Sequence, residues 1–516
     1  MADRPNFLCI VTDQQRADHL SCAGDPLLQT PHIDRIAADG VRFQRAYVNT
    51  PLCMPGRATM FTGRTSRGHG VRTNGVPLDY AVPTMTEALR QSGYRTHGVG
   101  KIHLRPFGTA KGREPAELDP RDFPESRAMW DSGRIEALPQ PYFGLERVEF
   151  AGGHGSWMWG DYLAWLRAQR ADGFDLLQAK AGTPTPHKAE QAWKSALPEE
   201  LHHSAWVADR TIAFLKAAAA EPKPFFLWCS FPDPHHPYCP PAPWSEMYDP
   251  AEVRFPIRRE GELDDLPPFY KRVFEQGMPL SGRFGATRMN DEQLREILAL
   301  TYGMISLFDH HVGRILDALE EAGLRENTVV TFMSDHGDMM GDHWLINKGP
   351  FHFDGLLKTP FLWSWPGRFQ PGVETDALAS HLDFAPTILD LAGVPIPEGP
   401  VPAVPEAPDM PPPWPGLSLA PILKGEEESL HGAVVVENDE DYLGLRLRTL
   451  ITERYQLTVY SGEDYGELFD LEEDPEQVHN LWSSAAHRSV REGLHHWLLH
   501  ELLLTDSALP RRLCHA

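Results

Sequence analysis

Cysteine is scarce in this chain, and long apolar stretches are missing from it. Six cysteines in 516 residues form no regular framework: Cys9, Cys22, Cys53, Cys229, Cys239 and Cys514. This scarcity argues against a disulfide-stabilised secreted fold and favours a reduced, cytoplasmic setting. The apolar run 7–11 is too short for the hydrophobic region of a signal peptide and is typical of a core strand. No other stretch is long and apolar enough to span a membrane, so we expect no membrane association.

Positive charge is also in short supply. The chain has 48 Lys and Arg against 72 Asp and Glu, which gives a formal net charge of −24. Such a charge repels nucleic acid and anionic membranes, so neither is expected as a partner. A small anionic substrate would need a locally cationic pocket. With 41% apolar residues, the chain is long enough for two or three structural units, or for one large α/β unit and a smaller one.

Strand-like and helix-like segments alternate along most of the chain. We expect strands at 6–12, 94–99, 224–231 and 328–333, and helices at 30–40, 84–93, 206–220 and 291–323, the last with a break near Asp309. Thr84 and Glu87 have the spacing of a capping box. The alternation predicts an α/β fold, a large and mostly parallel mixed sheet sandwiched by helices. Polar clusters follow four of the strands, at the sheet edge where ligands bind, which predicts one composite site.

The C-terminal part has a different pattern. A proline-dense segment at 395–415 is typical of an extended surface connection. Antiparallel strands are expected at 432–437 and 445–460, and a terminal helix at 488–504. We therefore predict an N-terminal catalytic domain at 1–425 and a smaller α+β subdomain, an antiparallel sheet plus a helix, at 426–516.

The segment from Cys53 to Arg64 reads Cys-Met-Pro-Gly-Arg-Ala-Thr-Met-Phe-Thr-Gly-Arg. It resembles the signature of the sulfatase family, Cys-x-Pro-x-Arg followed by Thr-Gly. The resemblance implies that Cys53 is oxidised after translation to formylglycine (3-oxoalanine) by a formylglycine-generating enzyme. A plainer interpretation makes Cys53 a small buried apolar residue at the start of a helix.

The resemblance extends over nearly the whole chain. Further matching segments, in order, are 6–13, 30–40, Gly-Lys-Ile-His at 100–103, Pro-His-His-Pro at 234–237, Ser-Asp-His-Gly at 334–337, Lys348 and 467–481. The implied metal ligands are Asp13, Gln14, the modified Cys53, Asp335 and His336. The implied catalytic residues, besides position 53, are Arg57 and Lys101 as binders of oxygens, His103 as base, and His235 and Lys348 at the leaving group. Asn74 resembles a residue that contacts substrate oxygens.

Each segment of the predicted site also has a purely structural interpretation. Asp13 is compatible with a strand end, Asp335 and His336 with an ordinary turn, and His235 with an exposed loop. Three histidine pairs match no motif of the family and are expected to lie on helix surfaces or in the core: His202-His203, His310-His311 and His495-His496.

Two positions depart from the pattern of many sulfatases. Gln14 replaces an Asp and His336 replaces an Asn. Carboxylate, amide and imidazole together suit Mn²⁺ better than an oxygen-only Ca²⁺ cage, although Ca²⁺ stays possible. The pattern looks like the branch of the phosphonate monoester hydrolases and choline sulfatases.

The sequence therefore predicts metal-assisted hydrolysis of an organic sulfate monoester through a covalent sulfo-formylglycine intermediate. The alternatives are a phosphonate monoester or phosphodiester hydrolase with the same site, and a binding protein with an unmodified Cys53. The segment 100–103 resembles the sulfatase branch and favours sulfate. The substrate's organic part is not predicted, because its pocket walls come from loops near 109–200 and 249–288. The tail after Leu504 is a candidate for docking on a second subunit, so a homo-oligomer is possible.

Overall fold

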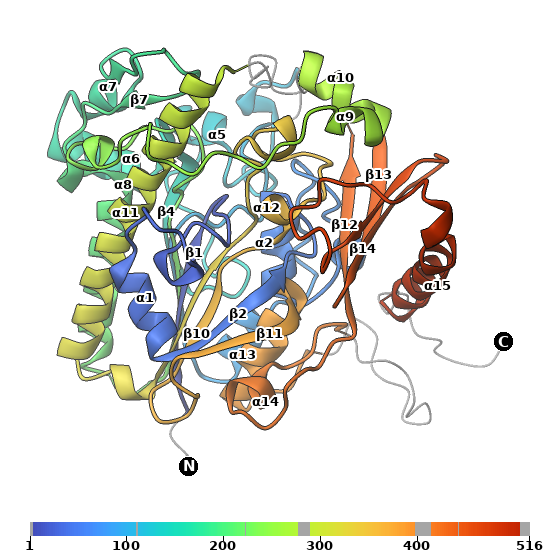
Figure 1. Cartoon of the computed structure of the whole chain (residues 1–516). Coiled ribbons are helices and arrows are strands. Elements are labelled where there is room, and N and C mark those ends of the chain that lie inside the picture. Colours follow the sequence, from blue (N-terminus) through green and yellow to red (C-terminus); the bar gives the residue numbers. More distant parts are fainter. Residues whose placement is uncertain are drawn as a thin grey trace.

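The computed structural model describes residues 4–109, 112–221, 223–276, 289–397, 414–441 and 443–505. Within these residues the chain forms a nine-stranded sheet, a four-stranded sheet and a two-stranded hairpin of β6 (Thr183–Pro184) and β7 (Trp193–Lys194) (Figure 1). The strands of the large sheet, in spatial order, are β11 (Val373–Ser380), β2 (Gly40–Tyr47), β10 (Phe361–Ser364), β9 (Thr328–Ser334), β1 (Asn6–Thr12), β8 (Phe225–Ser230), β3 (Arg95–Gly100), β4 (Arg147–His154) and β5 (Trp157–Gly160).

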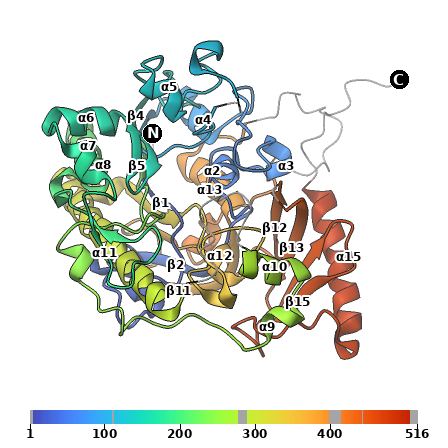
Figure 2. The same cartoon turned by 90° about the horizontal axis from the view of Figure 1, so that it is seen from above.

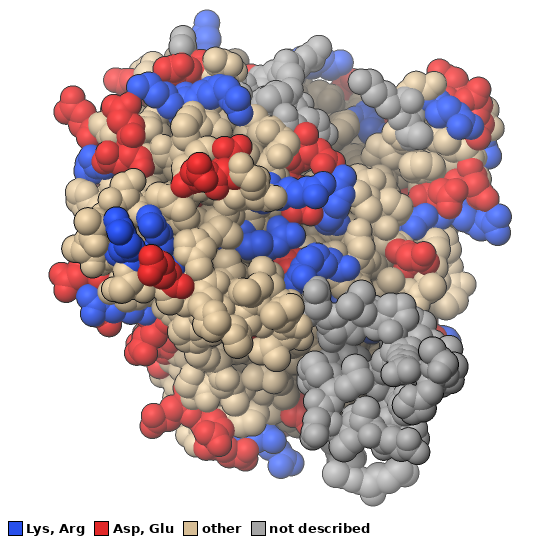
Figure 3. All heavy atoms as spheres, turned by 90° about the vertical axis from the view of Figure 1, so that its right-hand side faces the viewer, with Lys and Arg blue, Asp and Glu red and all other residues tan. Residues whose placement is uncertain are grey.

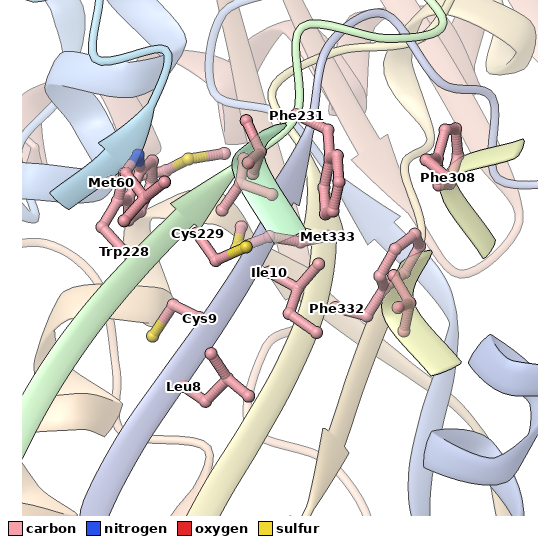
Figure 4. Close-up of a cluster of buried hydrophobic side chains, with 14 of the residues drawn as sticks. Leu8, Cys9, Ile10, Met60, Trp228, Cys229, Phe231, Phe308, Phe332 and Met333 are labelled. Atoms are coloured by element: carbon pink, nitrogen blue, oxygen red, sulfur yellow. The ribbon is translucent and has the colours of Figure 1, made fainter. Parts of the chain in front are cut away.

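The sheet is mixed but mostly parallel, as predicted. The neighbours β9, β1, β8, β3 and β4 all run parallel, whereas β10 runs antiparallel to both of its neighbours and β5 runs antiparallel to β4. Every residue of β1, β8 and β9 is buried, because helices cover both faces. Figure 4 shows their apolar side chains, Ile10, Cys229 and Met333 among them, packed at the centre of the core.

Two groups of helices enclose the sheet (Figure 2). One consists of α1 (Pro31–Ala38), α8 (His203–Ala218) and α11 (Asp291–Glu321), and the other of α2 (Cys53–Thr62), α4 (Met85–Gln91) and α13 (Phe384–Ala392). Thr84 caps α4 as predicted by accepting the N–H of Glu87 at 3.2 Å, but the Glu87 carboxylate pairs with Arg90 rather than closing a reciprocal box.

The predicted break near Asp309 is wrong, because α11 is continuous. Asp309 is a polar residue within an apolar run, yet it is buried and its carboxylate accepts the backbone N–H groups of His32 and Ile33 at 3.1 and 2.8 Å. It thereby satisfies donors in the first turn of α1, which have no partner within their own helix.

The C-terminal sheet contains the four antiparallel strands β12 (Ala433–Glu440), β13 (Leu445–Thr452), β14 (Tyr455–Tyr460) and β15 (Gly466–Asp470). Helix α15 (Arg488–Leu504) packs on one face through Leu494 and Leu498. The other face packs on the large unit, where Val436 and Phe469 join a cluster with Phe353. The smaller sheet-plus-helix unit is thus confirmed, and its boundary at 425/426 stays a prediction.

Surface features bear on the predicted partners. None of the helices in the described ranges has the length and apolar character needed to cross a membrane. Acidic and basic side chains are interspersed on the face that carries α15 (Figure 3). Leu499, Leu503 and Leu504 of α15 are exposed. The oligomeric state stays a prediction, and the tail after residue 505 and most of the proline-dense segment lie outside the described residues.

Candidate active site

The predicted composite site forms at the carboxyl ends of the central strands. Asp13 follows β1, Lys101 follows β3, His235 lies in the loop after β8, and Asp335 follows β9. Cys53 joins them from the first turn of α2. Backbone hydrogen bonds tie these ends together: the N–H of Asp13 donates to the carbonyl of Asp233 at 3.1 Å, and that of Asp335 to Thr12 at 3.2 Å.

Cys53 is buried at the N-terminus of α2 and faces charged partners. Its Sγ lies 2.9 Å from Lys348 Nζ, 3.1 Å from His336 Nε2 and 3.8 Å from Asp13 Oδ1. Burial opposes ionisation of the thiol, but the positive charge of Lys348 and Lys101 outweighs it and lowers the pKa of Cys53 below its ordinary value. The N-terminal end of the helix dipole favours negative charge at the same position. The site therefore suits an anionic oxygen or sulfur at residue 53.

Four residues offer ligand atoms that all lie within 4.8 Å of one another: Asp13, Cys53, Asp335 and His336. All four are buried. His336 Nδ1 lies 2.8 Å from the carbonyl of Gly337, so this nitrogen donates and Nε2 keeps its lone pair for the cluster. One cation already contacts this cluster, because Lys348 Nζ lies 2.9 Å from Cys53 Sγ and 3.1 Å from His336 Nε2. Carboxylate, imidazole and residue-53 donors converging on a positive charge fit a divalent metal ion.

Gln14 completes this donor set. Its backbone φ is 67°, a left-handed conformation that is uncommon for a residue other than glycine. The amide nitrogen donates to Asp338 Oδ2 at 2.5 Å, and the amide oxygen accepts from Lys348 Nζ at 3.0 Å. Sequence analysis did not single out Asp338, although it stands directly after the Ser-Asp-His-Gly segment.

Arg57 and Lys101 supply the local positive charge that the chain as a whole lacks. The guanidinium of Arg57 is fully buried and donates to Asp335 Oδ2 at 2.8 Å and to Ser230 Oγ at 2.9 Å. Its Nη2 has no hydrogen-bond partner among the described residues, which leaves one buried donor for an oxygen. Lys101 Nζ forms an ion pair with Asp13 Oδ2.

His103 lies in a tight turn with φ 58°. Burial, together with Lys101 and Arg57, holds the pKa of His103 well below its ordinary value, so the imidazole is neutral. Its backbone N–H donates to Glu125 at 2.6 Å, and the next two N–H groups donate to the same carboxylate at 2.8 and 3.0 Å. Glu125 positions the turn, and no motif in the sequence pointed to it.

His235 and Lys348 lie 3.0 Å apart, between His235 Nε2 and Lys348 Nζ. His235 Nδ1 lies 2.7 Å from the carbonyl of His236, so Nδ1 donates and Nε2 accepts from the lysine. Burial, His154 and Lys348 hold the pKa of His235 well below its ordinary value. Burial disfavours the charged lysine, but Cys53 and Asp13 raise the pKa of Lys348 above its ordinary value. Of this pair, Lys348 holds the proton.

Asn74 lies at the edge of the site. Its Oδ1 accepts the backbone N–H of Met54 at 3.0 Å, next to Cys53. Asn74, Met54 and His103 line one side of a surface cavity of about 620 Å³, whose other walls include Phe107 and Phe123. Loop residues 105–109 and 122–123 thus form part of the wall of this cavity, whose shape could not be predicted from the sequence.

The unmatched histidine pairs divide between core and surface. His202, His203 and His311 are buried, whereas the His310 side chain is 45% exposed. His202 and His203 lie beside Asp233, within a second group of ligand atoms no more than 4.8 Å apart.

Comparison with known proteins supplies the family context. A model of the sulfatase family matches residues 5–394, and a model of the N-sulphoglucosamine sulphohydrolase C-terminal region matches residues 341–502. The chain is 28% identical to an arylsulfatase of Clostridium perfringens over 97% of this chain and 94% of the relative. It is 26% identical to a choline-sulfatase of Rhizobium meliloti over 93% and 82%.

Solved structures share the same architecture. The chain is similar to the phosphonate monoester hydrolase of Agrobacterium radiobacter with a TM-score of 0.77 and 27% identity, covering 97% of this chain and 96% of that one. The overall fold predicted from the sequence is therefore shared with an enzyme of known structure.

Proposed function

This chain belongs to the sulfatase family, and we propose that it hydrolyses organic sulfate monoesters through a covalent sulfo-enzyme intermediate at residue 53. The observation that carries this proposal is the position of Cys53. It lies at a helix N-terminus, 2.9 Å from the half-buried Lys348 and within a cluster of metal-ligand atoms. The relatives named arylsulfatase and choline-sulfatase support a sulfate ester as the substrate.

Formylglycine at position 53 explains why a cysteine stands there. The hydrated aldehyde carries two hydroxyl groups on one carbon. The oxygen of the first attacks sulfur and displaces the alcohol, which leaves a sulfate ester on residue 53. The second hydroxyl then loses its proton, the carbonyl re-forms, and the C–O bond to sulfate breaks. A serine or cysteine has no second hydroxyl, so sulfate could not be released from it by this elimination. We propose that a formylglycine-generating enzyme installs the aldehyde.

The donor set Asp13, Gln14, residue 53, Asp335 and His336 would hold one divalent ion, which would polarise the ester oxygens and the attacking hydroxyl. The amide of Gln14 and the imidazole of His336 support Mn²⁺ over Ca²⁺.

The other residues handle protons and charge. Lys348 is protonated and donates toward the site, so it supplies the proton to the leaving oxygen, while His235 accepts from Lys348 and orients it. His103 is neutral and takes the proton of the second hydroxyl. Arg57 Nη2 and Lys101 stabilise developing negative charge on the oxygens. Asn74 contacts the substrate at the rim.

Phosphonate monoester hydrolysis is the second candidate. The similarity to the Agrobacterium radiobacter enzyme favours it, as does the metal pattern with Gln14 and His336. Lys101 and His103 favour sulfate, because they supply a charged contact and a base suited to releasing sulfate. A phosphonate carries carbon where sulfate carries oxygen, so one charge-assisted contact would lose its acceptor, at a cost of about 1–3 kcal/mol.

The experiment compares an aryl sulfate with the aryl phenylphosphonate that has the same leaving phenol. We expect kcat/KM to be about ten- to a hundredfold higher for the sulfate, with measurable turnover of the phosphonate. A clearly higher kcat/KM for the phosphonate would replace the first candidate with the second.

A further inference from the structure

Behind the active site lies a second cluster of metal-ligand side chains, formed by His202, His203 and Asp233. His202 and His203 stand at the start of α8, and Asp233 lies in the loop after β8. All three side chains are at most 2% exposed. His203 Nε2 lies 3.6 Å from Asp233 Oδ1, and His202 Nδ1 lies 3.8 Å from Asp233 Oδ2. These separations are too long for hydrogen bonds.

Two of these atoms lack the partners that buried polar atoms normally have. His203 Nε2 and Asp233 Oδ1 are buried and form no hydrogen bond within the part of the chain that the structure describes. Leaving such an atom unsatisfied typically costs about 1–3 kcal/mol. His203 Nε2 and Asp233 Oδ1 are neighbours and both lack a hydrogen-bond partner, so this costly arrangement needs a physical explanation.

Hydrogen bonds around Ser204 indicate where the lone pairs point. Ser204 Oγ donates to Asp233 Oδ2 at 2.5 Å, so its oxygen is free to accept from His203 Nδ1, 3.5 Å away. With the proton on Nδ1, His203 Nε2 presents a lone pair to Asp233 Oδ1. The two acceptors then repel each other unless a cation lies between them.

Among the described residues, no lysine or arginine pairs with the Asp233 carboxylate, and its one hydrogen bond from a side chain comes from Ser204. A buried carboxylate without a positive partner is unfavourable, and a divalent ion is one way to supply that charge.

We propose that His202, His203 and Asp233 bind a second divalent metal ion, separate from the catalytic one. Two imidazoles and one carboxylate form a donor set that Zn²⁺ uses in proteins. Ligands about 2.0–2.1 Å from a tetrahedral ion are about 3.4 Å apart, which is close to the 3.6 and 3.8 Å that separate the two imidazole nitrogens from the Asp233 carboxylate. His202 Nδ1 also accepts the N–H of Ser204 at 3.3 Å and would give up that bond.

The proposed ion would have a structural role. Asp233 lies two residues before His235, and its carbonyl accepts the N–H of Asp13. An ion at Asp233 would join the N-terminus of α8 to the loop that carries His235. His311 on the adjacent helix α11 also has a buried Nε2 without a partner in the described ranges.

The test measures metal content in protein that lacks the catalytic ligand Asp335. The full chain with Asp335→Ala is loaded with Zn²⁺, passed through a metal-free column and analysed by plasma mass spectrometry. We expect about one equivalent of Zn²⁺ to remain. Adding His203→Gln should remove it, whereas adding His310→Gln, an exposed control on α11, should not.

Co²⁺ provides a second, spectroscopic readout that reports the coordination geometry at the proposed site. The Asp335→Ala protein with Co²⁺ should show the intense visible bands of tetrahedral N/O coordination, and Asp233→Asn in that background should abolish them. Zn²⁺ content near zero in Asp335→Ala, or one equivalent retained after His203→Gln is added, would overturn the second site. Either result leaves the ester hydrolysis proposed above untouched, because that activity is measured separately in the wild-type protein.

Discussion

Asp338 accepts a hydrogen bond from the side-chain amide nitrogen of Gln14 at 2.5 Å, and this contact turns the amide oxygen of Gln14 toward the metal-ligand cluster. An amide can present either oxygen or nitrogen to a neighbour. A carboxylate accepts only, so Asp338 selects the nitrogen for itself and leaves the oxygen for a cation. Asp338 is held in turn by the backbone N–H groups of Met340 and Asn347.

Asp338→Asn should therefore weaken metal binding. The new amide can donate to the Gln14 oxygen, which would turn the Gln14 nitrogen toward the ion. Loss of such an orienting partner typically costs about 10- to 100-fold in metal affinity. Competition with a fluorescent chelator measures the affinity. Asp390→Asn changes an exposed carboxylate on α13 in the same way and should have no effect. Affinity within twofold of wild type in Asp338→Asn would contradict this role.

His103→Ala should separate the two chemical steps. In the proposed mechanism the first step does not use the His103 imidazole, so one equivalent of alcohol should be released in a burst. Release of sulfate should then be slow, because the second hydroxyl has lost its base, and we expect a decrease of about 10²- to 10⁴-fold. Rapid-quench kinetics with an aryl sulfate reveals both phases. A uniformly slow reaction without a burst would assign His103 a different role.

Lys348→Ala should matter most for poor leaving groups. Protonation by Lys348 is needed where the departing alkoxide is least stable, so the loss should grow as the pKa of the leaving phenol rises. A plot of log kcat/KM against that pKa should become steeper in the variant. His235→Asn removes the acceptor that orients the lysine and should steepen the plot less. Parallel plots for wild type and Lys348→Ala would argue that the lysine only binds the substrate.

Glu467 makes stability depend on pH. Its carboxyl is fully buried in β15, where burial raises its pKa to about 7 although Tyr460 donates a hydrogen bond to it at 3.1 Å. The folded state binds this proton more tightly than the unfolded state. The contribution of the Glu467 carboxyl to the free energy of unfolding is therefore complete below about pH 4.5, and it is lost as the pH rises to about 7.

In Glu467→Gln this loss should disappear. Relative to wild type, the variant should gain about 1–3 kcal/mol in the free energy of unfolding between pH 4.5 and pH 8. Urea unfolding at a series of pH values measures the difference. Equal pH dependence of the two proteins would show that Glu467 does not titrate in this range.

The sequence predicted the sheet and the residues that follow its strands, because buried parallel strands are continuous apolar runs and their ends are marked by polar clusters. It did not predict β2, β4, β5, β10 or β11. Of these, β5 and β10 have only four residues each, and β10 pairs antiparallel to strands that are distant in the sequence. It also missed Glu125. That carboxylate reaches the turn at His103 from a loop more than twenty residues away, and only the folded chain shows the contact.

Asp309 illustrates a second limit of sequence analysis. A polar residue within an apolar helical run has two explanations: it can mark a break in the helix, or it can be buried and cap another helix. The choice depends on α1, which lies far away in the sequence and packs against α11. The same limit applies to His202 and His203, whose proximity to Asp233 is created by the loop after β8.

The most direct test of the proposed function is the chemical state of residue 53 in protein of known activity. The chain is produced with and without a formylglycine-generating enzyme, and the peptide that contains Cys53 is analysed by mass spectrometry alongside kcat for an aryl sulfate. We predict that kcat rises in proportion to the fraction of formylglycine and is lost in Cys53→Ala. Full activity in protein that carries only unmodified cysteine at position 53 would contradict the proposal.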